Sequence, residues 1–81
     1  MDCCSLNRLP VGTWGEVVDL CLQGFTYRRM LDLGLIRGTL VRPLWKNSAG
    51  SLTAYLIKGA VIALRANETR HILVAPKGKA V

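Results

Sequence analysis

A short apolar hairpin in the second half of the sequence limits the fold more than any other feature. Two runs of β-forming residues, 52–57 and 60–64, are separated only by Lys58-Gly59. A two-residue connection that ends in glycine is typical of a tight turn between antiparallel strands. This half of the chain is therefore predicted to form a β-hairpin.

Further strands are predicted on both sides of the hairpin. Residues 14–22 are rich in β-forming side chains, residues 38–45 follow with a period of two, and residues 70–74 end the series. Pro43 cannot donate a hydrogen bond to a ladder, so its strand is expected to be an edge strand or to carry a bulge. Residues 66–69 are interpreted as a short turn.

One helix is predicted between the first two strands. Thr26 is a suitable N-cap, and apolar residues recur at helical spacing from Tyr27 onwards. Gly34 stands where a left-handed residue ends many helices, and Leu35 can pack back on the last turn. A helix of about eight residues is too short to stand alone, so a sheet has to hold it.

These elements predict an all-β fold, a small barrel of about five strands with one short inserted α-helix. The chain has 81 residues, too few for two packed layers, and closure into a barrel removes the exposed edges of a sheet. We expect one domain over residues 1–75 and a flexible basic C-terminal tail over residues 76–81.

The sequence predicts a cytoplasmic protein. Its clearest apolar run, residues 60–64, is far shorter than the roughly 20 residues of a spanning helix, and the start resembles no signal peptide. The 3 cysteines do not form a disulfide framework, which indicates free thiols in a reducing compartment. Cys21 is expected to be a small apolar core residue.

The charge leaves several partners open. The formal net charge of +6 favours nucleic acid, acidic protein surfaces or anionic lipid, and it also fits a role in solubility alone. Barrels that bind nucleic acid usually present several aromatic side chains on one face. The aromatic residues here are few and scattered along the chain, so this signal is weak.

No catalytic or metal site is predicted. His71 is the one histidine and is expected at an exposed strand position, and no paired-cysteine or paired-histidine spacing accompanies it. There is no nucleophile elbow and no phosphate-binding glycine loop, so neither enzymatic activity nor GTP hydrolysis by this chain is expected. No cofactor is predicted.

Several motifs occur together in one order between residues 6 and 75. They are Leu9-Pro10-Val11-Gly12, Arg28-Arg29-Met30-Leu31-Asp32-Leu33-Gly34-Leu35, Arg37-Gly38-Thr39, Ala54-Tyr55-Leu56-Ile57-Lys58-Gly59, Ala60-Val61-Ile62-Ala63-Leu64-Arg65, and Ile72 with Val74. In this combination the sequence resembles the ferrous iron transport protein A (FeoA) family. The resemblance implies an SH3-like barrel and a cytosolic partner role with the FeoB membrane transporter, which carries a GTP-binding domain. It implies contact with the membrane only through that partner.

The helix and the residues that follow it are the predicted partner surface. An apolar strip would supply affinity when buried, and surrounding arginines would steer the encounter with an acidic surface. A solvated helix face remains the alternative for the helical arginines. The predicted partner-binding residues are Arg28, Arg29, Met30, Leu33, Leu35 and Arg37.

Four further residues are given a structural role. Gly34, Gly38 and Gly59 are assigned to turns, and Arg65 is expected to bond a local carbonyl or Asp32 and so fix the helix to the barrel. The main alternative function is a basic small barrel that binds nucleic acid, and an iron carrier is a third. Self-association through an exposed strip or strand edge is also kept open.

Overall fold

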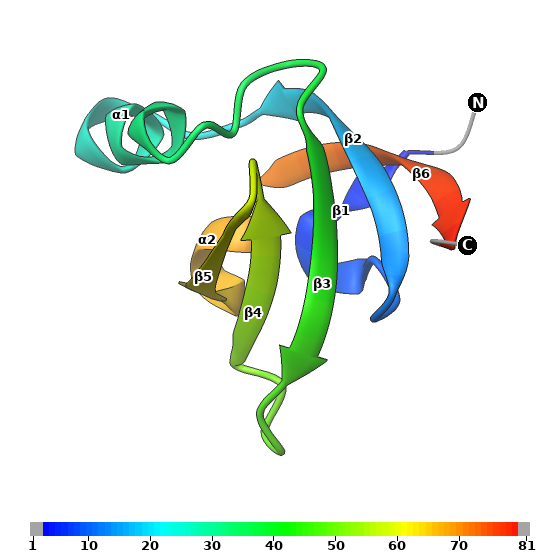
Figure 1. The fold of residues 1–81 in the computed structure, drawn as a ribbon. Helices are drawn as coiled ribbons and strands as arrows, with labels where there is room; N and C mark the ends of the chain where they lie inside the picture. The colour runs from blue at the N-terminus through cyan, green and yellow to red at the C-terminus, as the bar shows by residue number, and fades with distance from the viewer. Residues whose placement is uncertain (1–2, 80–81) are drawn as a thin grey trace.

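In the computed structural model, which describes residues 3–79, an antiparallel six-stranded sheet curls around one apolar core (Figure 1). The strand order is β1-β6-β2-β3-β4-β5. Along the chain the elements are β1 (Cys4–Ser5), the 3₁₀ helix η1 (Leu6–Arg8), β2 (Thr13–Leu20), α1 (Gly24–Asp32), β3 (Leu40–Lys46), β4 (Leu52–Ile57), β5 (Ala60–Arg65), α2 (Ala66–Thr69) and β6 (Ile72–Lys79).

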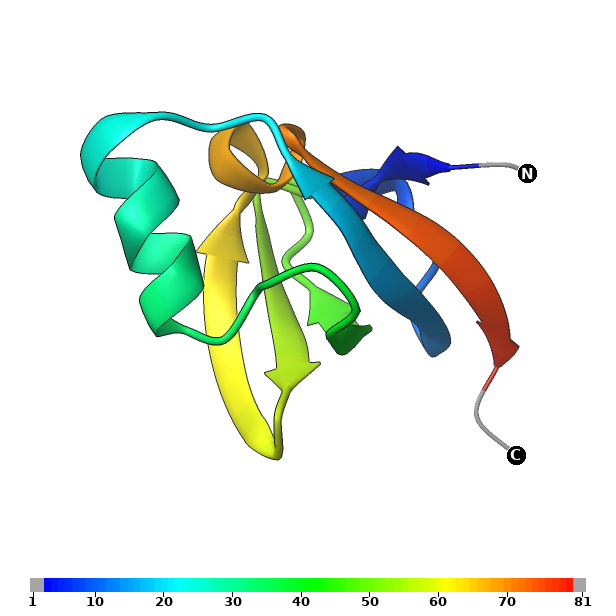
Figure 2. The same cartoon turned by 90° about the horizontal axis from the view of Figure 1, so that it is seen from above.

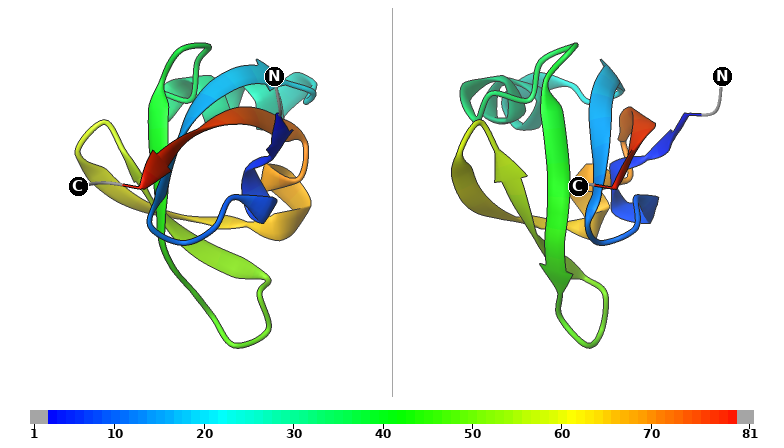
Figure 3. Two further views of the ribbon diagram at one scale, coloured as in Figure 1. Left: turned by 90° about the vertical axis from the view of Figure 1, so that its right-hand side faces the viewer. Right: turned by 45° about the vertical axis from the view of Figure 1, so that its right-hand side comes forward.

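The sheet forms a partly open barrel. Its edge strands β5 and β1 do not pair with each other within residues 3–79, and α2 and η1 contact one another near that gap. The view along the interior shows the chain forming a ring with these two short helices on one side (Figure 3, left). The predicted all-β class and small barrel are confirmed. The sixth strand arises because residues 4–5 pair with β6.

The hairpin agrees closely with its prediction. β4 has the predicted bounds, and β5 continues one residue further than expected, to Arg65. Lys58 has φ +48 and Gly59 has φ +82, so both turn residues lie in the left-handed region. Two such residues form the type I′ turn that matches the twist of antiparallel strands.

The helix begins earlier than predicted but ends where expected. It starts at Gly24, with Gln23 rather than Thr26 as the N-cap. At its end Gly34 has φ +96 and its N–H donates to the carbonyl of Leu31, 2.9 Å away. The N–H of Leu35 donates to the carbonyl of Met30 at 3.0 Å. These two bonds form a Schellman motif, which satisfies carbonyls that the helix leaves free.

Two segments differ from their predictions. Residues 66–69 form the short helix α2 instead of a turn. β6 begins at Ile72 and continues to Lys79, where a flexible tail from residue 76 was expected. The tail prediction is wrong for residues 76–79 because Thr13 and Trp14 extend β2 and pair with Lys79 and Gly78. Residues 80–81 lie outside the described part of the chain.

The strand after α1 contains the irregularity expected at its proline. The register between β3 and β4 shifts between Pro43 and Trp45, which marks a bulge. β3 begins at Leu40, and Gly38-Thr39 belongs to the preceding loop. The bulge accommodates a residue that lacks a backbone donor without ending the strand.

Strands and helices both contribute side chains to the core. Its fully buried side chains include Tyr55, whose hydroxyl has no partner at hydrogen-bonding geometry within the described chain. Burial raises the pKa of Tyr55, and the nearby hydroxyls of Thr69 and Thr53 offset part of this effect without completing a hydrogen bond. The apolar core consists of Leu6, Leu9, Val17, Met30, Leu35, Val41, Tyr55, Ile57, Leu64, Ile72 and Val74.

Candidate docking surface

The predicted apolar strip is largely inside the protein. Met30 and Leu35 are both 0% exposed and belong to the core, so assigning them to an exposed partner surface is wrong. Leu33 is half-buried and packs against the same cluster. A nine-residue helix cannot stand alone, and it uses this stripe to anchor itself on the barrel.

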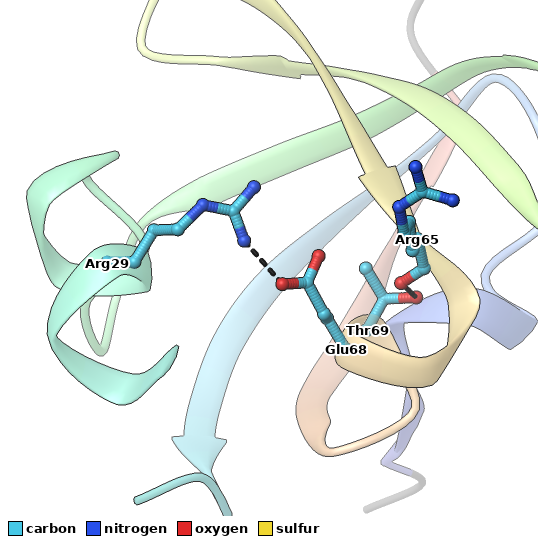
Figure 4. Close-up of polar contacts among 4 residues, drawn as sticks. All are labelled: Arg29, Arg65, Glu68 and Thr69. Atoms are coloured by element: carbon cyan, nitrogen blue, oxygen red, sulfur yellow. Dashed lines mark hydrogen bonds and ion pairs between the residues drawn. The ribbon is translucent and has the colours of Figure 1, made fainter. Parts of the chain in front are cut away.

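The predicted arginines have different surroundings. Arg28 is exposed on the outer side of α1. Arg37 forms an ion pair with Asp19 at 3.3 Å on the surface. Arg29 donates from Nη1 to the carboxylate of Glu68 and so joins α1 to α2 (Figure 4). Of these three, Arg29 therefore has a clear structural role.

Arg65 does not fix the helix in the way predicted. Its side chain is exposed and points away from the Arg29–Glu68 pair, and its carbonyl accepts a hydrogen bond from the hydroxyl of Thr69 at 3.3 Å (Figure 4). Asp32 is exposed as well. The polar contact expected from Arg65 is made instead by the ion pair between Arg29 and Glu68. Local sequence patterns could not reveal this pair because its residues are 39 positions apart.

The loop of residues 33–39 is held firmly at both ends. It crosses from α1 back to the start of β3 (Figure 2). Gly38 donates its N–H to the carbonyl of Val17 at 2.8 Å, and Val17 donates to the carbonyl of Thr39 at 2.9 Å. The Thr39 hydroxyl donates to the carbonyl of Gly34 at 2.8 Å. This loop is therefore tied both to β2 and to the end of the helix.

A groove of about 410 Å³ lies between this loop and the β4–β5 turn, and we call it the outer groove. Such a volume lies within the range of roughly 300–1,000 Å³ that is usual for binding pockets. Side chains from three adjacent strands form its apolar floor. The residues that line the outer groove are Trp14, Gly38, Thr39, Leu40, Leu56, Lys58 and Gly59.

Sheet register explains how distant residues form this floor. Gly15 pairs with Val41, so the preceding Trp14 lies opposite Arg42, and Arg42 in turn pairs with Leu56. The guanidinium carbon of Arg42 lies 5.8 Å from the centre of the Trp14 ring, within the range of a cation–π contact. Sequence reasoning missed this surface. The alternation of residues along each strand indicates which side chains share a face of that strand. Only the register shows which strands, and so which side chains, lie next to each other.

The charges around the outer groove are mainly positive. Glu16 pairs with Leu40 across the strands, and its carboxylate is bound by Lys77 at 3.2 Å. Lys58 lines the groove, and Arg42 contacts Trp14 and pairs with Leu56, two residues of its floor. Neither cation forms an ion pair within residues 3–79. The groove therefore combines an apolar floor with two cations that have no acidic partner in the described chain.

The cysteines and the histidine lie elsewhere. Cys21 is exposed just after β2, so its predicted place in the core is wrong. Its N–H donates to the carbonyl of His71 at 2.8 Å, and His71 is exposed as predicted, immediately before β6. Within residues 3–79, no three side chains of His, Cys, Asp or Glu gather into a potential metal site.

Comparisons with known proteins place the chain in a family. A model described as the FeoA domain matches residues 4–76. No curated protein matches the chain. A FeoA-like protein from Clostridium acetobutylicum has a similar structure, with a TM-score of 0.87 and 23% identity over 100% of this chain and 94% of that one.

Two further solved structures share more of the sequence. The FeoA protein from Chlorobium tepidum is 29% identical, with a TM-score of 0.83 over 89% of this chain and 69% of its own. FeoA from Stenotrophomonas maltophilia, described as an SH3 domain protein complexed with zinc, is 27% identical, with a TM-score of 0.76 over 88% of each chain. Because the domain model covers residues 4–76, this chain belongs to the FeoA family.

Proposed function

We propose that this protein is an accessory component of ferrous iron uptake that docks on the cytosolic GTP-binding region of a FeoB-type transporter and modulates it. The observation that carries the proposal is the FeoA domain match over residues 4–76. The related Stenotrophomonas protein is described as a suggested activating factor of ferrous iron transport. In this proposal the protein acts in the cytoplasm and binds its partner without catalysing a reaction.

The structure supports a binding role through its surface. Within residues 3–79, no helix has the length and apolar character needed to cross a bilayer. The chain instead presents exposed apolar side chains beside cations, a combination suited to a partner with an acidic, partly apolar surface. Of the predicted partner residues, Arg28 and Arg37 remain exposed and Leu33 half-exposed, and we propose that they contribute to this contact.

The net charge of +6 also favours the rival function of nucleic-acid binding. That function needs several aromatic side chains on one face. Phe25 and Tyr27 are 83% and 39% exposed on α1, but residues two positions apart in a helix do not face the same side. Trp45 is exposed near the C-terminal end of β3. Tyr55 is buried, and Trp14 has Arg42 over its ring. The described aromatic side chains therefore form no stacking platform.

The test is binding of the purified protein to the cytosolic region of the FeoB transporter from the same organism, measured anaerobically by calorimetry. We expect saturable binding that depends on whether the transporter region holds GTP or GDP. Single-stranded RNA at about 0.15 M salt is the comparison, and binding there is expected to be weak. Binding to RNA alone, with none to the transporter region, would favour the rival function.

A further inference from the structure

We propose that the outer groove receives an apolar side chain from an acidic segment of the transporter's cytosolic region. This inference rests on the proposed function and adds the place and the chemistry of docking. The groove lies on the outer face of the sheet, whereas sequence motifs pointed to the helix.

The floor suits an apolar side chain. Leu40 is 49% exposed, although the next residue, Val41, is fully buried. Leu56 lies across the strands from Arg42 and pairs with Val61 on β5, which is 56% exposed. This face therefore leaves apolar side chains on neighbouring strands partly open to water. Covering such a patch is favourable, by about 25 cal/mol for each Å² of apolar surface removed from water.

The frame of the groove is already built in the free protein. On one side Gly38 and Thr39 are bonded to β2, as described above. On the other side Lys58 and Gly59 form the tight turn, and the carbon stem of Lys58 lies against Gly34 at the end of α1. A frame held by backbone hydrogen bonds loses little conformational freedom when a ligand binds.

The charge identifies an acidic occupant. Lys58 and Arg42 lack acidic partners in the described chain. The carboxylate of Glu16, which pairs with Leu40 of the floor, is already bound by Lys77. A carboxylate beside the inserted apolar side chain would face these two cations. A second copy of this chain is a poor occupant because both copies carry a net charge of +6.

The test compares two leucines that are each the first residue of a strand. Leu40 begins β3 and lines the groove. Leu52 begins β4 at the end of the strand that is remote from the groove, and five residues, or roughly 17 Å, separate it from the other end of β4. The variants are Leu40→Glu and the control Leu52→Glu. Each is titrated by calorimetry against the cytosolic region of the FeoB transporter, after a ¹H–¹⁵N spectrum has shown that it is folded.

We expect Leu40→Glu to weaken binding at least about tenfold, because it removes an apolar contact and repels an acidic segment, and Leu52→Glu to change it less than about twofold. Lys58→Asn is the second variant, since asparagine tolerates the positive φ at this turn position. It should weaken binding severalfold and flatten the dependence of affinity on salt.

The outcomes separate the two proposals. If the wild type binds but Leu40→Glu and Lys58→Asn bind equally well, the groove proposal is overturned and docking on the transporter stands. If the wild type binds no transporter region with either nucleotide, the proposed function fails and the groove proposal fails with it. If Leu40→Glu changes the oligomeric state in analytical ultracentrifugation and leaves transporter binding intact, the groove holds a second copy and our assignment is wrong.

Discussion

Replacing Met30 by alanine tests what holds α1 on the barrel. One candidate is the Met30 side chain, which is 0% exposed in the core. The other is the ion pair between Arg29 and Glu68, whose side chains are 41% and 19% exposed. Truncating a buried methionine removes apolar contacts and leaves a cavity, at a cost of about 2–5 kcal/mol. An ion pair this open to water contributes at most about 1 kcal/mol, because solvent screens it.

We therefore expect the free energy of unfolding to fall by about 3 kcal/mol for Met30→Ala and by about 1 kcal/mol or less for Glu68→Gln. Urea denaturation followed by tryptophan fluorescence measures both values. Met30→Leu is the matched control, because it nearly conserves volume and should cost less than about 1.5 kcal/mol. Native-state hydrogen exchange in α1 shows whether the helix detaches before the barrel unfolds.

Equal costs for the two substitutions would contradict a dominant role of apolar burial. A cost below about 1 kcal/mol for Met30→Ala would mean that the core closes over the missing side chain without loss. A cost for Glu68→Gln as large as that for Met30→Ala would mean that the ion pair, and not apolar burial, fixes the helix.

Three further predictions concern single residues. Gly34→Ala should lower the free energy of unfolding by about 1 kcal/mol or more in a urea titration, because φ is +96 and the new Cβ would lie 3.1 Å from Cδ of Lys58. Burial raises the pKa of Tyr55 in the folded state, so the unfolded chain loses this proton first as the pH rises. The free energy of unfolding should therefore fall above pH 10.0, and it should fall less in Tyr55→Phe. The pKa of Cys4 is raised chiefly by burial, so Cys4 should react with iodoacetamide more slowly at pH 8 than the exposed Cys21, as peptide mass spectrometry would measure.

Local patterns were sufficient for the elements that depend on neighbours in the sequence. The turn at Lys58-Gly59 needs two left-handed residues, and the end of α1 needs one at Gly34, so glycine marked both places correctly. The bulge at Pro43 followed from its missing donor. In each of these cases the cause lies within a few residues of its effect.

Elements that depend on distant contacts were missed. Residues 76–79 contain proline, glycine and lysine and have no β pattern, yet they form strand because β2 offers free backbone partners at Thr13 and Trp14. The floor of the outer groove joins residues 14, 40 and 56, whose proximity depends on the register of three strands. Periodicity within one strand gives its faces but not its neighbours.

The burial of Met30 and Leu35 changes how the helix motif relates to docking. The sequence suggested that the whole apolar strip of the motif touches the partner, but Met30 and Leu35 anchor α1 and Gly34 turns the chain into the 33–39 loop. That loop then forms one wall of the outer groove through Gly38 and Thr39. If the outer groove is the docking site, as we propose, the motif shapes it through the loop that it positions. On this proposal, a core substitution in α1 weakens docking by disordering that wall, whereas a groove substitution such as Leu40→Glu weakens docking in a protein that remains stable.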